Sequence, residues 1–139
     1  MRYLIDTNIL IRLANEPDAI SKDIRNILED TDNLIYVSAV SIQEIFMLMS
    51  DNKLKDSRWK KPADVFNYIE YELYSPIKYV QKEHLLIFAE IVPAEGHGDP
   101  FDRIIIAQAI TERIPLISSD TKFNHYRKQK LEFIFNDKV

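Results

Sequence analysis

Residues 2–8 are Arg2-Tyr3-Leu4-Ile5-Asp6-Thr7-Asn8, a short apolar run that ends in three polar residues. The apolar run predicts a buried β-strand, and the helical spacing of Ile9, Leu10 and Leu13 after it predicts a helix. A strand that leads directly into a helix is the building unit of α/β proteins. Asp6 is therefore expected at the carboxyl end of a strand, where open parallel sheets bind their ligands.

The same alternation continues along the chain. Four further apolar segments predict strands at residues 34–40, 77–80, 115–118 and 131–135. The segments between them carry apolar residues at helical spacing and predict helices at residues 20–28, 41–49, 62–74, 82–91 and 100–110. We therefore expect an α/β domain of three layers, in which helices cover both faces of a mainly parallel sheet. A length of 139 residues without a Gly- or Ser-rich linker suits one domain over residues 1–139.

The composition excludes several classes of protein. The chain has no cysteine, which rules out disulfides and thiolate metal sites and favours a cytoplasmic location. No apolar run approaches the ~18 residues that span a bilayer, and Asp6 comes too early for a signal peptide, so no membrane partner is expected. The net charge of −4 weighs against tight, non-specific binding of nucleic acid by bulk charge. It leaves open an acidic site that approaches a phosphate through a metal ion.

Four acidic residues fall at comparable positions in this pattern. Asp6 and Asp120 each directly follow a predicted strand. Glu44 lies in the first turn of a helix that follows a strand, and Asp102 lies in the first turn of the helix that begins after Asp99. Because the carboxyl ends of parallel strands meet at one edge of a sheet, three of the carboxylates are expected there. Asp102 has no predicted strand before it and reaches the same edge only if its helix starts there, so we infer that the four converge.

Each of these residues also has a simpler explanation as a helix cap. Ser41 and Glu44 have the spacing of a capping box, and Asp99 before a proline is a good N-cap. A cap need not be a carboxylate, however, since Ser or Asn serves equally without mutual repulsion. Four carboxylates on one edge need a cation, or some of them must be protonated. The convergence therefore favours a metal site over four independent caps.

Oxygen donors without cysteine point to a hard cation, Mg²⁺ or Mn²⁺. Such an ion sits between carboxylates and a substrate phosphate, where it orients and deprotonates a water molecule for in-line attack. The residues by themselves predict hydrolysis of a phosphate ester. They leave open whether one or two ions bind.

Several blocks of sequence stand in a distinctive order, and together they are more specific than any one of them. They are Tyr3-Leu4-Ile5-Asp6-Thr7-Asn8, Ser38-x-x-Ser41-x-x-Glu44, His97-Gly98-Asp99-Pro100-Phe101-Asp102-Arg103 with Ile106-Ala107-Gln108-Ala109, and Leu116-Ile117-Ser118-Ser119-Asp120. In these blocks the chain resembles the PIN-domain nucleases over nearly its whole length. It looks most like the VapC-type toxins of bacterial toxin–antitoxin pairs.

The resemblance implies a parallel sheet in the strand order 3-2-1-4-5 and an endoribonuclease that depends on Mg²⁺ or Mn²⁺. It implies a homodimer, an inhibiting antitoxin protein as partner, and RNA as substrate. It assigns the acidic constellation to Asp6, Glu44, Asp102 and Asp120, with Asp99 close by. It also implies that three residues support the site by hydrogen bonds, namely Thr7, Asn8 and Ser118.

Within this set we expect Asp6 and Asp102 to be the principal metal ligands, because they stand at the centre of the predicted edge. Asp120 would complete the shell directly or through water, with Asp99 at its periphery. Glu44 would bind the metal or help to activate the water. These roles are hypotheses about the site.

Residues outside the acidic set have two interpretations each. The basic stretch Lys53–Lys61 around Trp59 is either an RNA-contacting patch with a base-stacking ring or, as we favour, a solvated helix end or connector with Trp59 packed at an interface. Arg103 would contact a substrate phosphate or, as we favour, neutralise neighbouring carboxylates. His97, a single histidine in a loop, is not expected to be a ligand. The apolar run Phe46–Met49 exceeds what one buried helix face needs and suggests a dimer or antitoxin surface.

Two other functions compete with the nuclease. A phosphatase of the haloacid-dehalogenase type has a similar sheet and an aspartate after the first strand. Its chemistry needs a second acid two residues later, where this chain has Asn8. A non-catalytic PIN-like RNA-binding module is the other alternative, and the intact acidic set argues against it.

Overall fold

The computed structural model describes residues 1–138, so Val139 at the end of the predicted domain lies outside them. Within the described residues, five strands form one parallel sheet in the order β3-β2-β1-β4-β5. This confirms the predicted α/β class and the strand order that the resemblance implies. The strands are β1 (Arg2–Ile5), β2 (Leu34–Ser38), β3 (Ile77–Lys78), β4 (Leu116–Ser118) and β5 (Phe133–Phe135).

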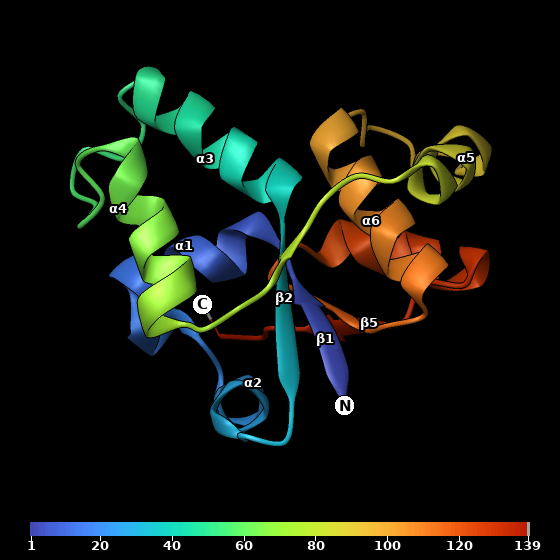
Figure 1. Cartoon of the computed structure of the whole chain (residues 1–139). Coiled ribbons are helices and arrows are strands. Elements are labelled where there is room, and N and C mark those ends of the chain that lie inside the picture. The colour runs from blue at the N-terminus through green and yellow to red at the C-terminus, as the bar shows by residue number, and fades with distance from the viewer. Residues whose placement is uncertain (139) are drawn as a thin grey trace.

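Helices cover both faces of the sheet and complete the three predicted layers (Figure 1). One face carries α1 (Thr7–Asn15), α2 (Lys22–Glu29), α3 (Ala39–Ser50) and α4 (Pro62–Asn67), with the short turns η1 (Pro17–Ala19) and η2 (Tyr68–Glu72). The other face carries α5 (Lys82–Glu90), α6 (Pro100–Glu112) and the helical turn η3 (Thr121–Gln129). Among residues 1–138, no helix is long and apolar enough to cross a membrane.

Alternate side chains of each strand enter two separate hydrophobic cores. On β1, Ile5 packs into the core beneath α1 and α3, whereas Leu4 packs into the core beneath α6. On β4, Ile117 packs into the same core as Ile5, and Leu116 packs into the same core as Leu4. All four side chains are fully buried, and each contributes roughly 1.5–3 kcal/mol of burial free energy. This packing holds β1 beside β4 and so places the residues that follow the two strands side by side.

The start of α3 differs from the prediction. The strand predicted at 34–40 ends at Ser38, whose hydroxyl accepts a hydrogen bond from the Val40 N–H (3.1 Å) and caps a helix that begins at Ala39. Glu44 therefore lies in the second turn of α3. Its interpretation as the N3 residue of a capping box is wrong, because the cap stands three residues earlier than predicted.

Trp59 belongs to the hydrophobic core. The residue is 2% exposed, and its ring packs edge-on against Tyr68 with 5.8 Å between the ring centroids. The basic side chains around it are exposed, and Arg58 pairs with Glu72 (2.6 Å). The basic side chains are solvated, as the favoured interpretation expects, but Trp59 lies in the core of this chain rather than at an interface. The alternative of a base-stacking tryptophan is wrong, because the ring is buried.

Truncation of this tryptophan tests the assignment. Trp59→Ala is expected to lower the free energy of unfolding by about 3–5 kcal/mol, because it leaves a large cavity beneath α4. Lys53→Ala, in the same segment but exposed, is the matched control and should change it by less than about 0.5 kcal/mol. Urea unfolding followed by circular dichroism measures both. Equal, small losses in the two variants would contradict the buried position of the ring.

Candidate metal centre

Asp6 lies at the middle of the carboxyl edge of the sheet. Its N–H donates to the Ile117 carbonyl (2.9 Å), which extends the β1–β4 ladder one residue beyond β1. The residue is 2% exposed. Its Oδ1 accepts from the Thr7 N–H (2.8 Å), and its Oδ2 accepts from the Ser118 hydroxyl (2.8 Å) and the Asn8 amide (2.9 Å). Neighbours in the fold therefore fix the direction in which this carboxyl group points.

Ser118 connects Asp6 to the acid that follows the next strand. The hydroxyl that donates to Asp6 also accepts the N–H of Asp120 (3.0 Å). The Asn8 side-chain N–H donates to the same hydroxyl (3.2 Å), and the Ser119 N–H donates to the side-chain Oδ1 of Asn8 (3.1 Å). The ends of β1 and β4 are thus joined by side chains as well as by the ladder.

Asp102 approaches the edge from α6. Asp99 caps this helix, since its Oδ1 accepts the Phe101 N–H (2.9 Å). The cap places Asp102 in the first turn, as predicted. The Asp102 side chain is 15% exposed, and its Oδ2 lies 2.9 Å from Nε2 of His97.

Glu44 reaches the same edge from α3. The Thr7 hydroxyl donates to the Ser41 hydroxyl (2.9 Å), which ties α1 to the first turn of α3 and positions the following turn. Oε1 of Glu44 is buried and has no hydrogen-bond partner within residues 1–138. Burial raises the pKa of Glu44, the nearby Thr7 hydroxyl opposes the rise, and the Asp99 carboxylate adds to it. A buried carboxylate oxygen without a donor is unfavourable unless it faces a cation.

The carboxylates act on one another across the edge. Burial raises the pKa of Asp6 to about 7, and the charges of Asp102 and Glu44 contribute. Burial raises the pKa of Asp102 to about 7 as well, with contributions from Asp99, Glu44 and Asp120. Groups that perturb each other in this way are close in space. The structure therefore brings together the acidic residues that the strand ends predicted.

This donor set fits a divalent cation. Carboxylate oxygens of Asp102 and Asp120 lie within 4.8 Å of each other, and the charge of Asp102 acts on Asp6. The buried Oε1 of Glu44 is without a donor among the described residues. Asp99 is a more peripheral candidate, because its Oδ1 already caps α6. Carboxylate oxygens of this number suit Mg²⁺ or Mn²⁺.

Neither Lys122 nor His97 was predicted from the sequence to lie at the site. Lys122 is exposed, and its positive charge lowers the pKa of Asp102. His97 offers a ring nitrogen that lies within 4.8 Å of carboxylate oxygens of both Asp102 and Asp120. The sequence signal for Lys122 is only its place two residues after Asp120. The signal for His97 is its position ahead of Asp99 in the specific block.

Arg103 does not have the role that we favoured. Its guanidinium group lies over the Phe88 ring at 4.2 Å from the centroid. Within residues 1–138 it forms no salt bridge, so the interpretation that it neutralises the carboxylates is wrong. Lys122 supplies the opposing charge near Asp102 instead.

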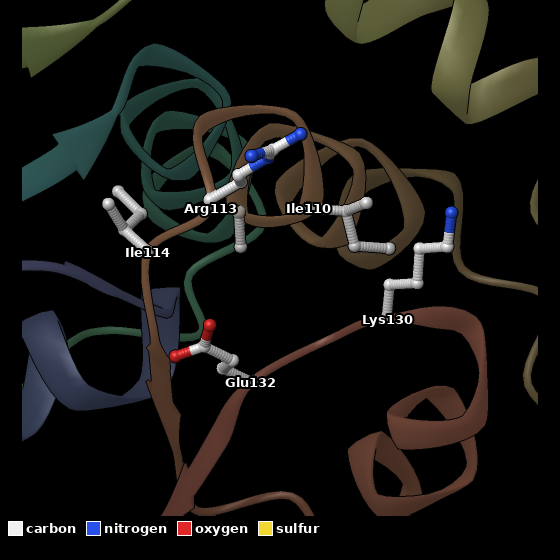
Figure 2. A pocket seen from close by; sticks show the side chains of 6 residues that line it. Ile110, Arg113, Ile114, Lys130 and Glu132 are labelled. Atoms are coloured by element: carbon white, nitrogen blue, oxygen red, sulfur yellow. The ribbon is translucent and has the colours of Figure 1, made fainter.

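One hollow of the protein lies away from the carboxyl edge. It has a volume of about 260 Å³ and lies between the end of α6 and the starts of β4 and β5, where Arg113, Lys130 and Glu132 surround Ile110 and Ile114 (Figure 2). None of the predicted acidic site residues lines it. The chemistry of the carboxyl edge is therefore separate from this hollow.

The raised pKa values predict how stability depends on pH. In the unfolded chain, both aspartates ionise near their ordinary pKa of 3.8, whereas in the fold they ionise near 7. Their contribution to stability is therefore fully present below pH ~4 and is lost as pH rises through ~7. Protein stripped of metal by EDTA should melt at a lower temperature at pH 8.5 than at pH 5.5.

Asp102→Asn separates this effect from other titrations. The amide is uncharged, and its oxygen can still accept the hydrogen bond from His97. The variant should be more stable than the parent by about 1–2 kcal/mol at pH 8.5 and indistinguishable from it at pH 4. Differential scanning calorimetry in EDTA measures both. A variant that melts below the parent at pH 8.5 would show that the carboxylates do not repel one another.

Solved structures with a similar fold include VapBC and FitAcB proteins. VapBC from Salmonella typhimurium bound to DNA has a TM-score of 0.67 at 14% identity, with 97% of this chain and 98% of that chain covered. VapBC2 from Rickettsia felis bound to a DNA fragment from its promoter has a TM-score of 0.66 at 18% sequence identity, with 99% of this chain and 100% of that chain covered. FitAcB from Neisseria gonorrhoeae has a TM-score of 0.62 at 22% sequence identity, with 96% of each chain covered. At these identities the likeness shows the fold alone.

Sequence comparison gives the family. No curated protein matches the chain significantly. The sequence model of the PIN domain family matches residues 3–129 of this chain. These residues include every acidic residue of the carboxyl edge described above. The chain therefore belongs to the PIN domain family.

Proposed function

We propose that this PIN domain is a Mg²⁺- or Mn²⁺-dependent endoribonuclease, and that residues 1–139 act as one domain. The observation that carries the proposal is Oε1 of Glu44, a buried carboxylate oxygen without a donor beside the desolvated carboxyl groups of Asp6 and Asp102. A fold that only needed helix caps would have no reason to leave an acid in this state. A divalent cation would satisfy that oxygen and offset the repulsion.

The residues of the edge have distinct tasks in this proposal. Asp6, Asp102 and Asp120 hold the cation, and Glu44 supplies its free oxygen to the ion or to the water that attacks. Ser118 and Asn8 keep the Asp6 carboxylate in place through hydrogen bonds to its Oδ2. When bound, the ion would polarise the phosphodiester and lower the pKa of the attacking water.

Exposed charge near the edge suits a polyanionic substrate. Lys122 stands beside Asp102 and is exposed, so it is available to a phosphate group of the incoming strand. The protein as a whole carries a net charge of −4, so binding by bulk attraction is weak. We infer that the cation and a few local lysines, rather than a broad basic surface, position the RNA.

We also propose an antitoxin protein as partner, a homodimer, and a cytoplasmic location. The structural neighbours include VapBC complexes, which supports a toxin role for this chain. On α3, Phe46 and Met49 pack against the core, whereas Met47 is 48% exposed. Part of the apolar run Phe46–Met49 is therefore available to a partner or a second copy.

The phosphatase alternative fits the site less well. Two residues after Asp6, where that chemistry needs an acid, the Asn8 amide donates to Asp6 and to Ser118. Asn8 thus serves to hold the carboxylate and has no proton to give to a leaving group at neutral pH.

Cleavage of RNA tests the proposal directly. Asp102→Asn is expected to lower the rate of cleavage in Mn²⁺ by roughly 100-fold or more, because a charged oxygen donor is lost while the hydrogen bond to His97 is kept. Asp32→Asn is the control, since Asp32 is exposed in the turn before β2 at the opposite end of the sheet. Labelled RNA pools, analysed by sequencing of the 5′ ends, report both rate and sites. An Asp102→Asn protein that cleaves like the Asp32→Asn protein would refute the proposal.

Metal binding should also stabilise the fold. Because only the folded chain brings the carboxylates together, Mn²⁺ at about 100 times its dissociation constant should add about 2.7 kcal/mol to the free energy of unfolding. Thermal melts at pH 7.5 with Mn²⁺, Mg²⁺ or EDTA measure the effect. The Asp102→Asn variant should show a much smaller response, and an equal response in both proteins would place the ion elsewhere.

A further inference from the structure

His97 is held in a defined orientation by a tight turn. The His97 N–H donates to the Ala94 carbonyl (2.9 Å), and Gly96 between them has a φ of +75°. A type II turn requires a positive φ at this third position, which glycine adopts without strain. The imidazole is buried, with 7% of the residue exposed, and packs against the rings of Phe123 and Tyr126.

Both ring nitrogens of His97 have partners. Nδ1 lies 2.8 Å from the Tyr126 hydroxyl, and Nε2 lies 2.9 Å from Oδ2 of Asp102. The Tyr126 hydroxyl also accepts the N–H of Ala94 (3.0 Å). Tyr126 is 1% exposed, so its own hydroxyl proton must find an acceptor inside the protein.

These contacts select one tautomer of the neutral ring. The acceptor within reach of the Tyr126 proton is Nδ1 of His97, so Nδ1 accepts and the ring proton is on Nε2. Nε2–H then donates to Asp102. The alternative, with the proton on Nδ1, would bury two lone pairs face to face at Asp102 and leave the Tyr126 proton unpaired.

We propose that His97 is a positioning residue that donates Nε2–H to Oδ2 of Asp102 and so holds this carboxyl group with its Oδ1 directed to the cation. The inference rests on the proposed metal-dependent function. Oδ1 of Asp102 makes no hydrogen bond within residues 1–138, so it is the oxygen that the arrangement leaves available. Tyr126 acts one step further away, because its proton fixes the tautomer that donates.

The arrangement differs from direct ligation by His97. A ligating nitrogen needs a lone pair directed at the metal, whereas here Nε2 carries the proton and Nδ1 faces Tyr126. Outer partners that orient ligating carboxylates typically change metal affinity by about 10–100-fold when removed. The two roles therefore make different predictions for spectroscopy and for conservative substitution.

The tautomer is tested first, in the full-length protein without metal. The ¹⁵N chemical shifts of the His97 ring at pH 8 should be those of the Nε2–H tautomer in the parent protein. Tyr126→Phe, which removes the hydroxyl donor, should shift them towards a mixture of the two tautomers. An Nδ1–H tautomer in the parent would overturn the proposal whether or not the protein is a nuclease.

Mn²⁺ affinity tests the positioning role. His97→Leu should weaken Mn²⁺ binding about tenfold or more, measured by the free-ion signal in electron paramagnetic resonance. His97→Gln places an amide N–H where Nε2 stands, and should bind within about threefold of the parent. Pulsed spectra of the parent complex should lack the nitrogen coupling of a directly bound imidazole.

The outcomes separate this inference from the proposed function. A parent protein that binds no Mn²⁺ would overturn both. A parent that binds Mn²⁺ while His97→Leu binds equally well would overturn only the positioning role, as would nitrogen coupling from His97. If the His97→Leu variant does not fold, the folded His97→Gln variant decides the matter. Mn²⁺ binding by His97→Gln as weak as that of Asp102→Asn would then overturn the positioning role.

Discussion

Repulsion among acidic side chains at one edge of the sheet is the constraint on which the rest of the structure depends. Asp6 and Asp102 are so desolvated and so close to other carboxylates that the pKa of each rises to about 7. The fold sustains this arrangement because β1 and β4 are locked together by fully buried side chains on both faces. An edge of this kind is unfavourable for the folded chain when the carboxylates are ionised, and either protonation or a bound cation would relieve the repulsion.

The acids are not equivalent in how the protein treats them. Asp6 receives three hydrogen bonds, from a backbone N–H, a hydroxyl and an amide, and these favour its ionised form. Glu44 has a buried oxygen that receives none. Asp6 is therefore fixed in position by the chain itself, whereas Glu44 would gain most from a bound cation. The site thus contains one carboxylate held by hydrogen bonds, Asp6, and one with an oxygen that lacks a hydrogen-bond donor, Glu44.

Much of this edge could be predicted from local sequence. The strand ending at Ile5 and the helix beginning at Pro100 have strong local signals, so Asp6 and Asp102 were expected where they lie. The start of α3 was displaced because Ser38 and Ser41 are both good caps, and only the packing of the strand decides between them. The error mattered, since it gave Glu44 a structural explanation that it does not have.

The parts that sequence reasoning missed depend on contacts between distant residues. Arg103 was expected to face the acids, but its place in α6 turns it towards Phe88, which no local pattern encodes. His97 had an unremarkable loop position, and its importance arises from Tyr126, 29 residues further along the chain. The hydrogen-bond acceptor for the proton of a buried hydroxyl can be identified only when the fold is known. In our proposal the same contact lets a single histidine, discounted as a ligand, act on the candidate metal site, because its proton rather than its lone pair would face the carboxylate.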